Sequence, residues 1–243
     1  MRLWLPRVVG ALAPARGYGL ERVPGQGGLV VAVNHFSAID PPLVGSFSRR
    51  TLYYLSKAEL LTVPFVGEVL RWTGAFALRR GASDRDAVRV ARWLLREGHA
   101  VGVFVEGSRQ RDRPGTALPG AAMLALKEKV PLVACGLESS GWTLSNRRRC
   151  AVVWGEPLRF DGLAANSRGI AEATRVVEAE IDRLWRQAAD AVAAGLPDRL
   201  ADGTIAGSPP SRREALPVRG TRPWPREAWA ATPLGPLWQP PRV

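Results

Sequence analysis

Two kinds of pattern alternate along the chain, short apolar runs and stretches in which apolar residues recur with the period of a helix. Residues 29–33 (Leu-Val-Val-Ala-Val) follow two glycines and are typical of a buried strand. Similar runs predict strands at 52–56, 75–78, 101–105, 131–137 and 150–154, and helical periodicity predicts helices at 40–49, within 57–72, from 83 to 98, at 119–127 and at 170–193. The alternation predicts an α/β fold with a mostly parallel central sheet covered by helices.

Composition divides the chain into three parts. Residues 25–207 are expected to form one domain, because 243 residues with 46% apolar content can bury one sizeable core. Residues 208–243 are rich in proline, arginine and glycine without periodicity, which predicts a disordered tail. Residues 1–24 combine Arg2 and Arg7 with apolar neighbours, and either contact a membrane surface or pack as an ordinary N-terminal segment. The absence of an apolar run of roughly 20 residues predicts no transmembrane helix.

The charge is strongly positive, with 34 basic against 22 acidic residues and a formal net charge of +12. This excess favours contact with anionic lipid headgroups, phosphorylated substrates or nucleic acid. Residues 147–149 are the densest basic run, which a solvated loop explains, and no nucleic-acid-binding motif is present, so nucleic acid is not expected as a partner. Two cysteines without a CxxC pair make a reducing cytoplasm the simplest compartment.

The first segment with candidate chemistry joins the strand at 29–33 to the helix that begins near Asp40. His35 follows the strand, and Asp40 precedes two prolines that favour the first turn of a helix, with Asp40 as a possible cap. On a continuous helix side chains five residues apart point about 140° away from each other, so His35 and Asp40 pair only across a turn. An imidazole with a pKa near 6.5 takes the proton of an attacking hydroxyl, and a carboxylate holds its tautomer. The pair resembles the base and orienter of a serine-hydrolase triad, with the substrate's own hydroxyl as the nucleophile.

Two later segments add groups that suit an anionic substrate. Arg79 and Arg80 follow the strand at 75–78, and Glu106-Gly107-Ser108-Arg109 follows the strand at 101–105. Guanidinium groups bind phosphate oxygens in a bidentate manner, and a glycine lets the backbone approach a ligand closely. The alternative is that Arg79 and Arg80 are solvated loop charges and that Glu106 pairs with a neighbouring arginine. The second histidine, His99, lies between a helix end and a strand, where a structural role is expected.

Taken together, the ordered segments resemble the lysophosphatidic acid acyltransferase family of glycerolipid acyltransferases, over roughly residues 29–141. Its four blocks find counterparts in His35 and Asp40, in Gly74, Phe76 and Arg79, in Phe104 to Arg109, and in Val130-Pro131-Leu132-Val133. The resemblance implies a glycerol-3-phosphate acyltransferase-like fold. It also implies site roles: His35 as general base, Asp40 as its orienter, and Arg79, Glu106, Gly107, Ser108 and Arg109 as binders of the acceptor's phosphate.

Three positions depart from the family pattern, namely Val105 for proline, Ser108 for threonine and Ala134 for a second proline. Ser108 keeps the hydroxyl, so the departures concern the acceptor's identity more than the type of reaction. The donor's chain length and carrier are not legible in the sequence.

The resulting hypothesis is a cytoplasmic enzyme, peripheral on the inner face of the cell membrane, that moves a fatty acyl group onto a lysophospholipid. The acceptor expected is 1-acyl-glycerol-3-phosphate, giving phosphatidate, and the donor is acyl-CoA or an acyl carrier protein thioester. Neither a metal nor another cofactor is expected. Alternatives are an acceptor such as glycerol 3-phosphate, another lysophospholipid or an aminolipid, and a non-catalytic Arg-rich protein that binds anionic membrane or nucleic acid. A serine hydrolase is disfavoured because no Gly-x-Ser-x-Gly elbow occurs.

Overall fold

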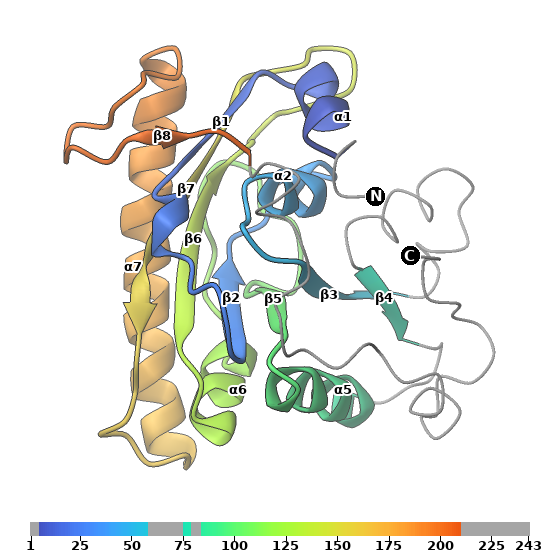
Figure 1. The fold of residues 1–243 in the computed structure, drawn as a ribbon, viewed down its shortest axis with the longest axis vertical. Helices are drawn as coiled ribbons and strands as arrows, with labels where there is room; N and C mark the ends of the chain where they lie inside the picture. The colour runs from blue at the N-terminus through green and yellow to red at the C-terminus, as the bar shows by residue number, and fades with distance from the viewer. Residues whose placement is uncertain (1–4, 58–74, 79–83, 210–243) are drawn as a thin grey trace.

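A computed structural model describes residues 5–57, 75–78 and 84–209, and it has one mixed sheet covered by helices (Figure 1). The strands are β1 (Ala15–Tyr18), β2 (Leu29–Val33), β3 (Leu52–Lys57), β4 (Ala75–Leu78), β5 (Ala100–Phe104), β6 (Leu132–Glu138), β7 (Cys150–Leu158) and β8 (Ala206–Gly207). The helices are α1 (Leu5–Leu12), the 3-10 helix η1 (Leu20–Arg22), α2 (Asp40–Ser46), α5 (Asp84–Arg96), α6 (Gly120–Glu128) and α7 (Ser167–Ala193). The α/β architecture predicted from the alternating pattern is therefore confirmed.

The strands lie in the order β4-β3-β5-β2-β6-β7-β1-β8. The five strands from β4 to β6 are parallel to one another, β7 is antiparallel to β6, and β1 is parallel to β7. A parallel sheet must be covered on both faces because its crossover connections run over them. This accounts for the continuous apolar character of β2, whose five residues are all buried.

Two apolar clusters fill the space between sheet and helices, one on each face. Val30 and Ala32 of β2 pack with residues of α5, α6 and α7, whereas Val31 and Val33 pack with residues of α1 and α2. Successive side chains of a strand point to opposite faces, so the single run at 29–33 serves both cores. The structure therefore has three layers with the sheet in the middle (Figure 1).

Helix α7 lies directly against β6, and a glycine makes this close approach possible. A Cβ atom on Gly136 would lie 2.2 Å from the backbone carbonyl carbon of Leu184 and 2.3 Å from the backbone nitrogen of Trp185. No larger residue fits at this position without moving the helix. The long helix predicted at 170–193 is confirmed, and it begins slightly earlier, where the Asn166 side chain accepts a hydrogen bond from the amide of Gly169.

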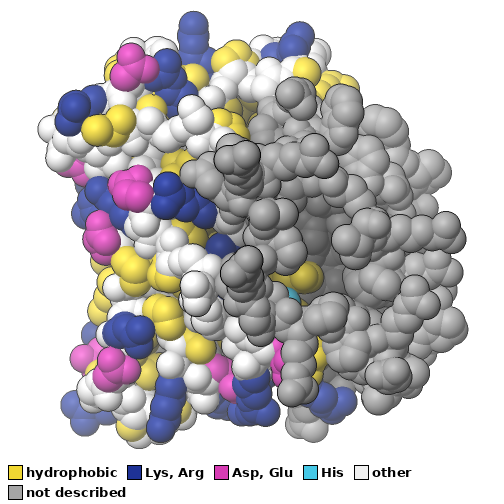
Figure 2. Space-filling view, in the orientation of Figure 1, with side chains coloured by type: hydrophobic (Ala, Val, Ile, Leu, Met, Phe, Trp, Pro, Cys, Tyr) yellow, Lys and Arg dark blue, Asp and Glu magenta, His cyan; other side chains and the backbone are white. Residues whose placement is uncertain are grey.

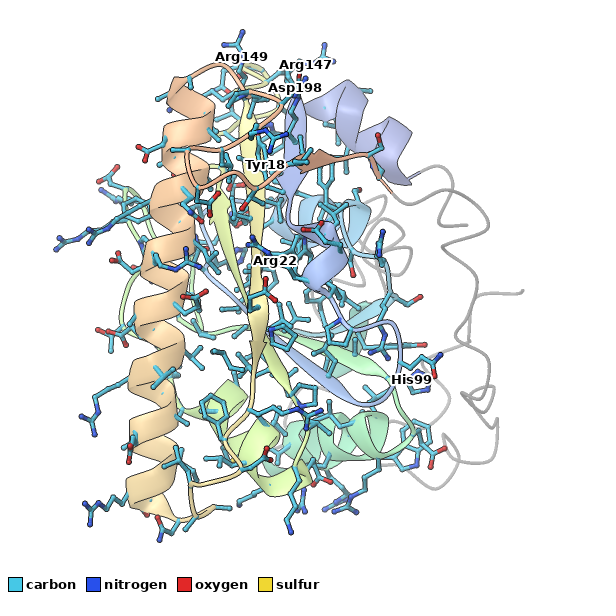
Figure 3. All side chains as sticks on the ribbon, turned by 60° about the vertical axis from the view of Figure 1, so that its left-hand side comes forward. Tyr18, Arg22, His99, Arg147, Arg149 and Asp198 are labelled. Carbon is cyan, nitrogen blue, oxygen red and sulfur yellow. The ribbon has the colours of Figure 1, made fainter. Side chains whose placement is uncertain are left out.

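The edge of the sheet beyond β7 was not apparent in the sequence. β1 joins β7, and the two-residue β8 closes the edge, so part of the segment 1–24 is built into the same sheet as the later strands. Tyr18 donates from its hydroxyl to the Pro197 carbonyl at 2.8 Å, and Arg22 donates to the Trp154 carbonyl and to Thr204 Oγ1 at 2.9 Å each (Figure 3). The contacts to Pro197 and Thr204 bind the chain after α7 to β1 and η1, and the contact to Trp154 binds η1 to β7.

Val9 of α1 is buried against the cluster that contains α2, which supports the packed N-terminal alternative for this residue. No helix among the described residues is long and apolar enough to cross a membrane. The helix predicted within 57–72, and the tail from residue 210 onward, lie outside the described residues.

Candidate active site

The candidate site lies where three neighbouring parallel strands end. His35 follows β2 after one intervening residue, Glu106 follows β5, and Ser139 directly follows β6. β2 lies between β5 and β6, so all three strands present their carboxyl ends at one edge of the sheet. Open α/β sheets bind ligands at this edge. The second histidine, His99, precedes β5 and therefore lies at the opposite edge, where its ring contacts Tyr53 and Trp93.

A turn between β2 and α2 brings His35 against Asp40. The imidazole Nδ1 lies 2.8 Å from Asp40 Oδ2, and the Asp40 amide donates to the Ser37 carbonyl at 3.3 Å. The predicted turn is therefore confirmed. Asp40 does not cap α2 as predicted, because Ile39 occupies the cap position and the carboxylate instead turns back onto the residues before the helix.

Asp40 is completely buried, and all of its hydrogen-bonding capacity is directed at neighbouring donors. Oδ2 accepts from the amides of Phe36 at 2.6 Å and Ser37 at 2.8 Å in addition to His35. Oδ1 accepts from the Ser37 hydroxyl at 2.8 Å and the Ser139 hydroxyl at 2.5 Å. A buried carboxylate is tolerated only when such donors replace its hydration. The carboxylate is thus held in one orientation by five groups.

These contacts determine which nitrogen of His35 is available for chemistry. An ionised carboxylate only accepts hydrogen bonds, so Nδ1 carries the proton of the neutral ring and Nε2 has a free lone pair. The ring stacks on Phe104, with the two centroids 4.3 Å apart and the planes inclined by 30°. The backbone beside it is fixed by Asn34, whose side-chain amide exchanges two 2.8 Å hydrogen bonds with the backbone of Leu137 on β6. The geometry therefore leaves Nε2 in a fixed position with a lone pair that could accept a proton.

Glu106 is buried beside the dyad and binds the protein's own backbone. Its two oxygens accept from the amides of His35 at 2.9 Å and Gly115 at 2.8 Å. Burial raises the pKa of the Glu106 carboxyl, and the two amide hydrogen bonds oppose that rise. The Glu106 side chain thus connects the backbone of His35 to the loop after β5. Its predicted contact with an acceptor phosphate stays a prediction.

The remaining predicted site residues divide between the loop after β5 and a part of the chain outside the structure described. Gly107 has φ of 68°, a left-handed conformation that favours glycine, and Ser108 and Arg109 are exposed beside it. This loop is held to the dyad because the amide of Gln110 donates to the His35 carbonyl at 2.8 Å. Arg109 is the residue immediately before Gln110, whose backbone contacts that of His35. Arg79 lies outside the described residues.

A cavity of about 440 Å³ borders the same loop on the side that faces α7. Its lining carries charges of both signs, from Arg113 and from Glu178 and Asp182. Glu178 accepts from the Ala117 amide at 2.9 Å, and Asp182 pairs with Arg186 at 2.7 Å. The cavity therefore lacks the uniformly positive surface that would select a phosphate. Within residues 5–57, 75–78 and 84–209, no three His, Cys, Asp or Glu side chains are grouped so as to hold a metal ion.

The two serines that contact Asp40 escaped the sequence prediction. Ser37 lies inside the His-x-x-x-x-Asp segment, where its position three residues before Asp40 was a local signal. Ser139 is 99 residues from Asp40 and meets it only because β6 lies beside β2. Nothing in the sequence around Ser139 marks it.

Replacing Ser139 with alanine should lower kcat about tenfold and leave KM for both substrates nearly unchanged, because a hydrogen bond to a charged group contributes roughly 1.5–3 kcal/mol. The matched control is Ser140→Ala, since Ser140 donates its hydroxyl to Glu138 instead of Asp40. Steady-state rates of turnover measure both variants. Equal kcat values in the two variants would contradict a role for Ser139 in holding Asp40.

Comparison with known proteins assigns this arrangement to a class. A family model described as Acyltransferase matches residues 15–138, from the start of β1 to the end of β6. The chain belongs to this acyltransferase family, and it is an O-acyltransferase. Its membership sets aside the alternative of a non-catalytic Arg-rich binding protein.

The chain is also similar to individual members of the family and to a solved structure. The chain is similar to a 1-acyl-sn-glycerol-3-phosphate acyltransferase of Bacillus subtilis (strain 168), 28% identical over 180 residues that cover 69% of this chain and 89% of the relative. It is also similar to a lyso-ornithine lipid O-acyltransferase of Pseudomonas aeruginosa, 37% identical over 52% of this chain and 48% of that one. The crystal structure of the LPA acyltransferase PlsC from Thermotoga maritima shares the fold, with a TM-score of 0.58 and 21% identity over 75% of this chain and 77% of that one.

Proposed function

We propose that the protein transfers a fatty acyl group from an acyl thioester to the hydroxyl of a lysophospholipid, with 1-acyl-glycerol-3-phosphate as acceptor and phosphatidate as product. The observation that carries the proposal is the His35–Asp40 pair, a 2.8 Å contact between an imidazole and a fully buried carboxylate. It lies at the ligand-binding edge of the sheet in a chain of the acyltransferase family. The acceptor is taken from the name of the Bacillus subtilis relative.

In the proposed reaction His35 acts as general base and then as general acid. The acceptor hydroxyl gives its proton to Nε2 while its oxygen forms a bond to the thioester carbonyl carbon. The tetrahedral intermediate then collapses, the carbon–sulfur bond breaks, and the imidazolium returns the proton to the departing thiolate. An ester and a free thiol result. Asp40 stabilises the imidazolium between the two steps.

Direct attack by the acceptor is favoured over an acyl-enzyme by the positions of the nearby hydroxyls. Ser37 and Ser139 are the serines that touch the dyad among the described residues, and both direct their hydroxyls at Asp40 Oδ1. Asp40 Oδ1 lies on the far side of the carboxylate from the imidazole contact at Oδ2. Neither serine is therefore placed to give its proton to Nε2. The reaction assigns no step to a metal or another cofactor, and the co-substrate is acyl-CoA or an acyl carrier protein thioester.

Binding of the acceptor's phosphate is assigned to Arg79 and to the loop Glu106-Gly107-Ser108-Arg109. The exposed Arg109 and the left-handed Gly107 support this role for the loop, because a guanidinium and an unobstructed backbone suit an anionic ligand. Since both lipids of the reaction reside in a bilayer, the proposal places the enzyme at the membrane surface, on the cytoplasmic face where the thioester donors are found.

The Pseudomonas relative favours a second candidate acceptor, a lyso-aminolipid. Purified protein incubated with lysophosphatidate and a set of acyl-CoA donors should release free thiol and form phosphatidate in equal amounts. The same assay with acyl carrier protein thioesters distinguishes the donors. Turnover with a lyso-aminolipid but not with lysophosphatidate would identify the lyso-aminolipid as the acceptor. Thiol release without any lipid product would contradict acyl transfer.

A further inference from the structure

The connection between β6 and β7, residues 139–149, combines basic and apolar groups on one exposed loop. Its sequence, Ser-Ser-Gly-Trp-Thr-Leu-Ser-Asn-Arg-Arg-Arg, has three consecutive arginines and no acidic residue. The side chains of Arg147, Arg148 and Arg149 are exposed, and Leu144 is 66% exposed. Among the described residues, none of the three arginines forms an ion pair with a carboxylate. Large apolar residues this exposed are few in the described part of the chain, and this one lies beside a cluster of positive charge.

The loop has a defined shape and is attached to α1. Asn146 accepts from the Thr143 amide at 2.9 Å and donates from its side chain to the Gly141 carbonyl at 2.7 Å. Trp142 packs on the apolar cluster below and donates to the Leu12 carbonyl at 3.3 Å. Arg147 donates to the carbonyl of Ala11. The exposed leucine and the arginines are thus presented by a braced turn, next to the end of α1, as Figure 3 shows for Arg147 and Arg149.

This surface lies close to the dyad. The loop begins at Ser139, whose hydroxyl donates to Asp40 at 2.5 Å. Leu144 is five residues further on, and five residues span at most about 18 Å. The exposed loop therefore begins beside the dyad, at the same end of the sheet.

We propose that residues 139–149 form the surface on which the enzyme sits on an anionic phospholipid bilayer, with Arg147, Arg148 and Arg149 at the headgroup phosphates and Leu144 in the acyl boundary. This inference rests on the proposed function, because it concerns how the enzyme meets a bilayer acceptor. Exposed arginines and an exposed apolar side chain on one loop match the two layers of such a surface, charge outside and hydrocarbon beneath. Nucleic acid would use the arginines but leave Leu144 in water.

The experiment measures sedimentation of the whole 243-residue chain with vesicles of phosphatidylcholine, with and without phosphatidylglycerol. Each arginine near an anionic surface contributes roughly a fivefold change in binding. The variant Arg148→Ser/Arg149→Ser should therefore bind phosphatidylglycerol vesicles roughly 25-fold more weakly. Leu144→Asp should weaken binding to a similar degree. The matched control is Arg168→Ser/Arg175→Ser, which removes the same charge from exposed positions near the start of α7.

The outcomes separate this inference from the proposed function. Acyl transfer to a short-chain lysophosphatidate that stays monomeric should be the same in all variants, because the loop is not needed once the acceptor is in water. Loss of vesicle binding in the loop variants but not in the control supports the inference, even if lysophosphatidate is not the acceptor. Equal vesicle binding by loop variants and control would overturn it. So would unchanged vesicle binding together with a raised KM for acyl carrier protein thioesters, which would assign the loop to an acidic protein partner.

Discussion

Replacing His35 with alanine should lower kcat by about a thousandfold, because a positioned general base typically contributes 10²–10⁴-fold. The fold should persist, since the Asp40 carboxylate keeps four of its five donors when the imidazole is removed. KM for the acyl donor should change little, because the imidazole acts on the acceptor's proton. Thiol release by the purified variant, compared with the unmutated protein at equal concentration, measures the effect.

A control distinguishes loss of the base from loss of structure. The space vacated by the His35 ring borders Phe104 and Asp40, so imidazole added to the His35→Ala variant should occupy it and restore part of the rate. Unfolding of the variant by heat should be cooperative and close in temperature to that of the unmutated protein. Full activity in the variant without added imidazole would remove His35 from the mechanism.

The dyad was predictable from sequence because its two members are local. A buried strand, a break and a proline pair at a helix start leave little chain between His35 and Asp40, so only a turn fits. The spacing of the two residues was therefore enough to predict that their side chains meet across a turn. The same holds for the position of Glu106, because the strand predicted at 101–105 places the next residue at the edge of the sheet, and β5 ends only one residue earlier, at Phe104.

The contacts that could not be predicted are those that depend on which strands become neighbours in the sheet. Ser139 contacts Asp40, and Glu106 binds the amide of His35 across 71 positions of sequence, only because β2 lies between β5 and β6. Apolar periodicity identifies strands without giving their order. The prediction of Glu106 as a phosphate ligand came from the resemblance, whereas its hydrogen bonds to two backbone amides are visible only in the fold.

The sheet edge shows the same limit. β1, with the sequence Ala-Arg-Gly-Tyr, has neither an apolar run nor alternation, and it becomes a strand because β7 offers it a partner. The composition of β7 likewise gave no indication of whether this strand runs parallel or antiparallel to β6. Its antiparallel pairing with β6 follows from the connection at 139–149, which is too short for a helical crossover between parallel strands.

Replacing Asp40 with asparagine should separate catalysis from folding more sharply than any other change in the site. The asparagine oxygen can take the place of Oδ2 and accept from the Phe36 and Ser37 amides, while its NH₂ group faces the two serine hydroxyls. Those hydroxyls can rotate to accept, because a hydroxyl both donates and accepts. Every buried polar group therefore keeps a partner, and the loss of stability should be small. The negative charge that stabilises the imidazolium is gone, so kcat should fall about 10²–10⁴-fold, as a neutral amide does in a serine-protease triad.

The matched variant is Asp40→Leu, which branches at Cγ as aspartate does but accepts no hydrogen bond. It leaves two buried amides and two buried hydroxyls without their acceptor, and each such group costs about 1–3 kcal/mol. Asp40→Leu should therefore be both inactive and several kcal/mol less stable in urea unfolding, whereas Asp40→Asn should be inactive and nearly as stable as the unmutated protein. If Asp40→Asn kept full activity, the carboxylate would serve only to shape the turn, and the imidazolium would need another source of stabilisation. If both variants unfolded equally early, the charge itself would be part of the fold, because the five donors around Asp40 would then require an anion and not merely an acceptor.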